Sequence, residues 1–139
     1  MTTVHIVTVA GREWLNANDR IHWAIRAELT DSWKNLTRLA ARAAELPRFD
    51  GKVHITAVCL FPDRRRRDPG NWYPTAKACI DGLTDSYVKV KPQLAVRVAG
   101  WLADDDAKHL DGPDMRARIE PGTRQPTLEL HITECGDEL

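Results

Sequence analysis

Apolar and polar residues alternate along three stretches of the chain, residues 3–10, 52–61 and 127–133. A period of two is typical of β-strands, because successive side chains of a strand point to opposite faces of the sheet. In the stretch 52–61 both sets of alternating positions are at least partly apolar, which predicts a central strand that is covered on both faces. In the stretch 127–133 only one set is apolar, so this strand is expected to bury a single face.

A helical period of apolar residues marks two further stretches. The first starts at Asn18 or Asp19, either of which can cap a helix, and extends to about Leu46. It fits one long helix or two helices with a break near residues 30–32. The second covers about residues 74–85, with a proline in its first turn, where proline is tolerated.

In residues 87–101, apolar and basic residues alternate both before and after a break at Pro92. This pattern predicts a hairpin with one apolar and one basic face. The whole pattern predicts one α/β (α+β) domain over residues 1–139. We expect a small mixed sheet of three to four strands packed by two to three helices, with a parallel pair where a helix separates two strands. The tail, residues 134–139, is expected to fray.

The composition is that of a globular protein, with 42% hydrophobic and 29% charged residues in a chain of 139. Twenty basic and twenty acidic residues cancel, so the molecule as a whole is not a polycation. A surface for nucleic acid would therefore have to come from clustered charge. Such clusters exist: Arg64–Arg67 is a run of four positive side chains, and Asp104–Asp106 is a run of three negative ones.

Three cysteines, Cys59, Cys79 and Cys135, are an odd number without CxxC spacing, which favours free thiols in a reducing compartment. The start MTTVHIVTVAG lacks the basic segment and the long apolar run of a signal peptide. No apolar run approaches the length of a membrane span. We therefore expect a soluble, cytoplasmic protein.

Polar residues gather in three places around the predicted central strand. Asp68 and Asn71 follow that strand in a loop, Lys77 and Asp81 are one turn apart on the next helix, and the acidic run 104–106 lies in a later loop. Carboxylates that meet at the end of a sheet repel each other unless a cation is present. Mg²⁺ fits such a place, since one or two carboxylates together with water and phosphate oxygens usually hold it.

This pattern indicates metal-assisted phosphodiester hydrolysis on nucleic acid, with a lysine assisting and the arginines of the run 64–67 holding phosphates. Simpler interpretations stay open for each residue. Asp68 also suits a cap of the following turn, and Lys77 with Asp81 also suits an ordinary surface ion pair. Trp72 is either a core residue or a stacking partner for an exposed base.

Four quoted stretches, "RRRRDPGN", "PTAKACIDGL", "WLADDD" and "HLDGPDM", resemble the RusA-type Holliday junction resolvases, especially phage versions, and "WLNANDRIHWAIRA" is similar as well. The resemblance covers about residues 12–116. It implies a RusA-like fold and a homodimeric endonuclease that binds four-way DNA junctions in a bacterial cell, including a phage-infected one. It also implies that Mg²⁺, with Mn²⁺ as a substitute, supports paired symmetric nicks.

The resemblance assigns roles residue by residue. The residues matched to catalysis are Asp68, Lys77 and Asp105, and those matched to metal binding are Asp68, Asp81, Asp104 and Asp105. Asn71 matches the asparagine of the family's D-x-D-N stretch. With the arginines, which are predicted from their charge, the expected DNA-binding residues are Arg64, Arg65, Arg66, Arg67, Asn71 and Lys77.

Three departures from the family pattern accompany these matches. Gly70 stands where many members have a second aspartate, the gap between Asn71 and Lys77 is longer, and residues 86–100 form an insertion before the acidic motif. The loss of one carboxylate leaves a second hypothesis open, a catalytically weak or inactive protein that binds branched DNA and keeps the fold. A third is a solvated basic loop on a domain unrelated to DNA. The inserted hairpin either contacts DNA or extends a dimer interface.

Overall fold

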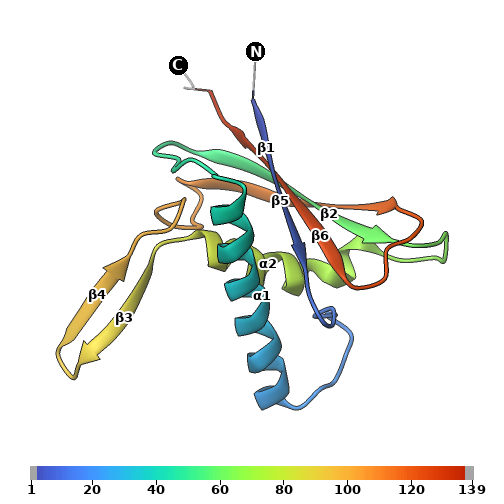
Figure 1. The fold of residues 1–139 in the computed structure, drawn as a ribbon, viewed down its shortest axis with the longest axis horizontal. Helices are drawn as coiled ribbons and strands as arrows, with labels where there is room; N and C mark the ends of the chain where they lie inside the picture. The colour runs from blue at the N-terminus through green and yellow to red at the C-terminus, as the bar shows by residue number, and fades with distance from the viewer. Residues whose placement is uncertain (1–2, 137–139) are drawn as a thin grey trace.

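The computed structural model describes residues 3–136 and is built around one mixed four-stranded sheet (Figure 1). The strands lie in the order β1-β6-β2-β5; β6 pairs antiparallel with β1 and β2, whereas β2 and β5 are parallel. The bounds are β1 Val4–Ala10, β2 Val53–Phe61, β5 Leu110–Ile119 and β6 Thr127–Glu134. The expected fold class, a small mixed sheet with helices, is confirmed, including its parallel pair.

The strand β5 is the element that the sequence pattern did not predict. Along its pairing with β2, His54 faces Asp111 and Thr56 faces Asp114, so β5 carries one extra residue at this point. The extra residue is accommodated at Gly112, whose φ of 109° suits glycine, and a Cβ there would meet the Ile55 carbonyl oxygen at 2.6 Å. Gly112 and Pro113, a pair typical of turns, stand near the start of β5, whereas residues 114–119 alternate as in a strand.

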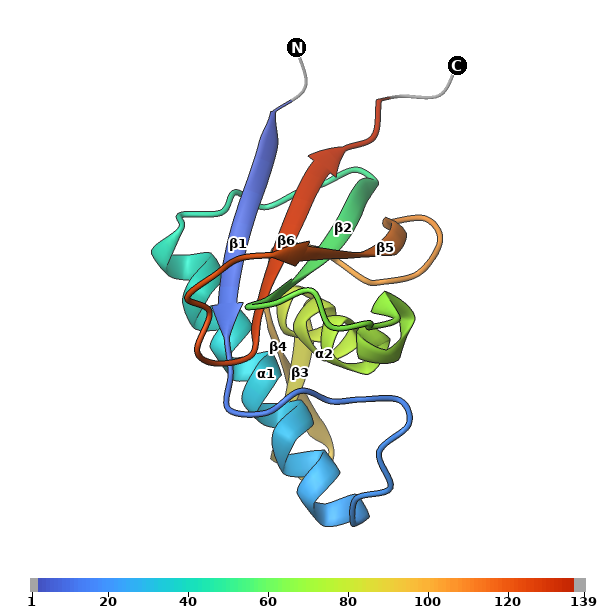
Figure 2. The ribbon, with the colours of Figure 1, turned by 90° about the vertical axis from the view of Figure 1, so that its right-hand side faces the viewer.

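Two helices, α1 Trp23–Ala43 and α2 Tyr73–Leu83, pack on the same side of the sheet (Figures 1 and 2). They touch closely at Gly82, where a Cβ would lie 2.5 Å from the Lys34 carbonyl oxygen. The core forms between these helices and one face of the sheet. Its largest fully buried members include Trp33, Ile55, Ile80, Leu83, Leu128, Leu130 and Ile132.

Two predictions about these elements were wrong in part. The helix α1 is continuous through residues 30–32, but it starts four or five residues later than expected, because the ring of His22 accepts the Ala24 N–H at 3.2 Å and caps it. The helices also pack on only one face of β2, although Val58 and Leu60 on the other face are buried. The polar side chains of His54 and Thr56 lie half-buried on that face, beside Glu129 and His131 of β6.

The predicted hairpin is confirmed as β3 Ser86–Lys91 and β4 Leu94–Val98, an antiparallel pair that projects away from the body (Figure 1). At the other end of the chain, β6 includes Glu134, and the Cys135 N–H donates to the Lys52 carbonyl at 2.8 Å. The expectation of a frayed tail is therefore wrong for residues 134 and 135, and residues 137–139 lie outside the described part.

Within residues 3–136, no helix is long and apolar enough to cross a membrane. All three cysteines are free thiols. Burial raises the pKa of both Cys59 and Cys79 to about 12, so these thiols stay protonated and act as small core residues.

Candidate active site

Lys77 joins two carboxylates that come from different parts of the chain. Its Nζ lies 2.7 Å from Asp81 Oδ1, one turn further along α2, and it also contacts Asp105 Oδ2, from the loop between β4 and β5. All three side chains are partly exposed. The structure therefore brings together three of the residues that the sequence singled out, and we call them the Lys77 cluster.

Backbone contacts at the end of α2 place Asp105 in this cluster. The N–H groups of Trp101 and Leu102 donate to the Leu83 carbonyl at 2.7 and 3.1 Å, and the Asp85 N–H donates to the Leu102 carbonyl at 2.8 Å. Leu102 is buried in the core below. The chain that leaves the hairpin is thus fixed against the end of α2, and the acidic run follows three residues after Trp101.

The charges of the cluster stabilise one another. The Lys77 ammonium donates a hydrogen bond to Asp105 and lowers the pKa of that carboxyl. Partial burial opposes the charge on Lys77, but hydrogen bonds to Asp105 and Asp81 outweigh it and raise the pKa of the lysine. At neutral pH Lys77 therefore keeps its proton and acts as a cation.

The neighbours of Asp105 in the acidic run differ in their surroundings. Asp104 Oδ1 accepts the Asp105 backbone N–H at 2.7 Å and otherwise faces solvent. Asp106 Oδ1 bonds to His109 and accepts the Lys108 N–H at 3.2 Å, so this carboxylate orders its own loop. The hydrogen bond to His109 lowers the pKa of Asp106. Asp104 thus remains beside the cluster, whereas Asp106 is engaged elsewhere.

Asp68 does not contact the cluster in the structure. It caps a short 3₁₀ helix, Pro69–Trp72, and its Oδ1 accepts the Gly70 N–H at 3.0 Å. The Asn71 N–H donates to the Asp68 carbonyl, and the Asn71 carbonyl accepts from Ala17. The capping interpretation of Asp68 is therefore confirmed, and this segment lies directly before α2, which carries Lys77.

Among residues 3–136, no three or more His, Cys, Asp or Glu side chains gather in an arrangement that could hold a metal ion. The Lys77 cluster nevertheless shows that carboxylate oxygens of Asp81 and Asp105 converge on one point, which a cation, the lysine ammonium, fills. Mg²⁺ is commonly held by one or two carboxylates together with water. The donor chemistry at this point therefore fits Mg²⁺.

The arginine run divides into exposed and engaged side chains. Arg64, Arg65 and Arg66 are exposed. Arg67 is only 18% exposed, because its guanidinium pairs with Asp63 at 2.9 Å and lies 4.3 Å from the ring centre of Phe61. Its charge is largely satisfied within the protein. Arg65 Nε also lies 3.6 Å from Asp63 Oδ2, but this side chain stays 82% exposed, so three of the four arginines remain open to solvent.

Trp72, at the end of the 3₁₀ helix, is 8% exposed. Its ring centre lies 4.8 Å from that of Phe61 and 6.1 Å from that of Trp14. The core interpretation of this residue is confirmed, because its ring is already packed against two others and has little surface left for a base.

The sequence interpretation missed Asp85, which organises the chain next to the cluster. Its side chain is 5% exposed, accepts two hydrogen bonds from Arg48 at 2.7 and 3.1 Å, and accepts the Gly100 N–H at 2.7 Å. The bond to Arg48 lowers its pKa to about 2. A signal existed, since an acid just past the C-terminal end of a helix is opposed by the helix dipole and needs a partner.

No protein-family model matches the chain. Three curated proteins, each named crossover junction endodeoxyribonuclease RusA, are similar to it. The Shigella sonnei protein is 35% identical over 104 residues, which cover 75% of this chain and 70% of that protein. The proteins of Escherichia coli strain K12 and Enterobacteria phage 82 are 37% identical over 86 residues, which cover 62% of this chain and 55% of each relative.

Proposed function

The chain belongs to the RusA family of crossover junction endodeoxyribonucleases, and from this we propose that it resolves four-way (Holliday) DNA junctions by Mg²⁺-dependent hydrolysis of phosphodiester bonds. The observation that carries the proposal is the Lys77 cluster, in which carboxylates of Asp81 and Asp105 converge on one cation position. This is the arrangement that a hard divalent cation and a phosphate require of a protein.

Asp81 and Asp105, with Asp104 beside them and Asp68 from the preceding segment, would hold Mg²⁺. The bound ion would supply positive charge against the scissile phosphate and a water of lowered pKa. A lysine has an ordinary pKa of 10.5 and is a cation at neutral pH, and Lys77 contacts both of these carboxylates. Its role is therefore to stabilise negative charge on the reacting phosphate and not to accept a proton.

Positive side chains would bind the DNA backbone around this point. Arg64, Arg65 and Arg66 are exposed on the loop that precedes Asp68, and they suit contacts to phosphates. Arg67 is assigned a supporting role, because Asp63 already holds it. Asn71 has an amide side chain next to the same loop and completes the proposed contact surface.

A homodimer is part of the proposal. A four-way junction is cut symmetrically only if two sites act on two strands, and a two-fold pair of identical subunits supplies them. Each chain would then make one of the paired nicks. Mn²⁺ is expected to substitute for Mg²⁺, since carboxylate and water ligands suit both ions.

The test is cleavage of a labelled four-way junction in Mg²⁺ by the wild type and by the variants Asp68→Asn and Asp105→Asn. Loss of a metal carboxylate is expected to lower the cleavage rate at least about 10- to 100-fold. Asp31→Asn, a change of an exposed carboxylate on α1, is the matched control and should cut at the wild-type rate.

Cleavage that survives both substitutions would overturn the assignment of the site. Junction binding by the wild type without cleavage in either Mg²⁺ or Mn²⁺ would instead favour the second hypothesis, a branched-DNA-binding protein without activity. The absence of salt-dependent affinity for DNA would contradict both.

A further inference from the structure

The hairpin of β3 and β4 has two chemically different faces. Val88 pairs with Val96, and Tyr87 pairs with Arg97, so alternate cross-strand pairs lie on opposite faces. One face carries five aliphatic side chains that are 38–58% exposed: Val88, Val90, Leu94, Val96 and Val98. The other, which we call the basic face, carries Tyr87, Lys89 and Arg97. Lys91 follows at the turn, after an irregularity in the register that sets it opposite Leu94.

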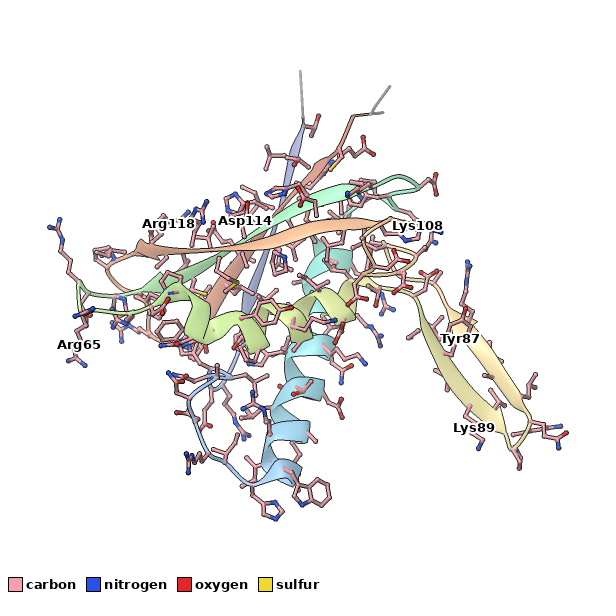
Figure 3. All side chains as sticks on the ribbon, turned by 180° about the vertical axis from the view of Figure 1, so that it is seen from behind. Arg65, Tyr87, Lys89, Lys108, Asp114 and Arg118 are labelled. Carbon is pink, nitrogen blue, oxygen red and sulfur yellow. The ribbon has the colours of Figure 1, made fainter. Side chains whose placement is uncertain are left out.

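The basic face is open to solvent. Lys89 and Lys91 are exposed and make no ion pair with any residue that the structure describes. Arg97 remains 55% exposed although its guanidinium lies 3.6 Å from Asp85, and Tyr87 is 71% exposed. Figure 3 shows Lys89 far out on the hairpin and Tyr87 nearer to the body. Positive charge thus follows the length of the hairpin.

The hairpin is fixed at its base, next to the Lys77 cluster. It connects the end of α2, which carries Asp81, to the loop that carries Asp105. Asp85 directly precedes β3 and accepts a hydrogen bond from the Gly100 N–H, after β4, so it joins the two ends of the hairpin. Arg48 in turn holds the Asp85 carboxylate. A surface on the hairpin is therefore held in a defined position relative to the cluster.

We propose that the basic face of the hairpin is a second DNA-binding surface, which holds the duplex arm adjoining the phosphate at the Lys77 cluster. Lys89, Lys91 and Arg97 contact phosphates, and Tyr87 packs against the sugar–phosphate backbone. The inference rests on the proposed function and adds to it a surface that the arginine run does not supply.

The dimensions fit this role. A strand of six residues is about 20 Å long, which is roughly six base pairs of duplex at 3.4 Å each. This face is positively charged and the DNA backbone is negatively charged, which favours DNA over a protein as its partner.

The experiment measures the affinity of the double variant Lys89→Gln/Lys91→Gln for linear duplex and for a four-way junction, without divalent metal, over a series of salt concentrations. Each lost phosphate contact removes about 0.9 from the slope of log affinity against log salt, so the slope should fall by about 2. Between 50 and 200 mM salt, the wild type should then lose about tenfold more affinity than the variant.

Two comparison variants make the result specific. Val88→Thr/Val96→Thr changes the opposite face without changing charge and should keep the wild-type slope. Lys52→Gln removes an exposed positive charge far from the hairpin in the sequence and should also keep it. Thermal unfolding of each variant checks that the fold is intact.

An unchanged slope for the lysine variant overturns the inference. Weaker binding by the valine variant, together with its dissociation into monomers, also overturns it and shows that the hairpin joins two copies of the chain. Failure of the proposed function gives a different result, because the wild type would then not cut the junction. The salt dependence of binding to linear duplex would still show whether the hairpin contacts DNA.

Discussion

Lys77 lies between two carboxylates at the surface, where an ion pair contributes little to folding. Exposed pairs of this kind stabilise a protein by about 0–1 kcal/mol each, because water screens the charges and two long side chains lose freedom. The repulsion between Asp81 and Asp105 would remain if the lysine were absent. The ion pairs are therefore a minor term in folding, and the proposed binding of a cation and a phosphate would give this convergence a function.

Gly70 is the residue at which a carboxylate of the family pattern is missing, and the structure leaves room for one. Its φ is not positive, and a Cβ at this position would meet only Asp68 Oδ1, at 3.4 Å, an ordinary van der Waals contact. We therefore expect Gly70→Asp to fold normally and to lower the Mg²⁺ concentration for half-maximal junction cleavage several-fold, since carboxylate ligands attract this ion.

Gly70→Asn is the control for this substitution, because it adds a side chain of the same size without charge. Titration of Mg²⁺ in a cleavage assay measures both variants. Equal Mg²⁺ dependence in the two variants would contradict a metal site near residue 70.

At the scale of elements, the hairpin depends on the contacts at its base. A two-stranded hairpin is marginally stable on its own. Here the chain on either side of it is paired, because Thr84 and Leu102 form an isolated bridge and Asp85 binds both Arg48 and Gly100. These contacts fix the direction of the hairpin and the position of the acidic run together.

Removal of the charge at Asp85 tests this coupling. Asp85→Asn is expected to lower the free energy of unfolding by about 1–2 kcal/mol at pH 7, because a nearly buried charged hydrogen bond to Arg48 is lost. The pKa of Asp85, about 2, is below its ordinary value of 3.8. Between about pH 2 and pH 3.8, the Asp85 carboxylate therefore binds a proton more readily in the unfolded chain than in the folded protein.

The stabilisation from Asp85 is consequently complete above about pH 4 and disappears as the pH falls towards 2. Urea unfolding of the wild type and of Asp85→Asn should converge over this range. Asp31→Asn, at an exposed position on α1, should match the wild type throughout. A difference between wild type and Asp85→Asn that persists unchanged at pH 2 would contradict the assignment to this ion pair.

Local patterns predicted most of the elements. The hairpin of β3 and β4 was found because aliphatic residues alternate with basic or small ones on both sides of its turn. The strand β5 was missed although Met115, Ala117 and Ile119 alternate with charged residues, because Gly112 and Pro113 near its start are typical of a turn. The start of α1 was misplaced because a histidine, an uncommon cap, replaces the expected Asn18 or Asp19.

At the candidate site too, local spacing predicted some contacts and contained no information on others. The pair of Lys77 and Asp81 followed from a spacing of four residues on one helix. The addition of Asp105 to this pair agrees with the role that the family resemblance assigned to it. The contact of Arg48 with Asp85 joins residues 37 positions apart, and no local pattern contains that information.

The whole molecule is neutral, but the arginine run and the basic face of the hairpin lie at the two ends of one axis. Figure 3 shows Arg65 and Lys89 at opposite ends, with α2 between them. The Lys77 cluster lies on α2 and on the loop beside it. A nucleic acid laid along this axis would meet exposed positive side chains on both sides of the cluster. The clustering of charge, and not its total, therefore supports a DNA-binding surface.

Assembly into a homodimer is the prediction that belongs to this scale. Light scattering should give twice the mass of one chain, because paired nicks require two sites. A plasmid that carries a cruciform, an extruded four-way junction, distinguishes the two outcomes of cutting. Paired nicks convert it to linear DNA, whereas a single nick leaves an open circle.

A mixture of wild type and Asp105→Asn tests whether the two sites of a dimer act together. After subunit exchange, mixed dimers have one intact site and should produce open circles that neither protein yields alone. The wild type by itself should give mainly linear product. If the mixture yields only linear DNA, in proportion to its wild-type content, then the two nicks do not come from separate subunits, and the dimeric mechanism is contradicted.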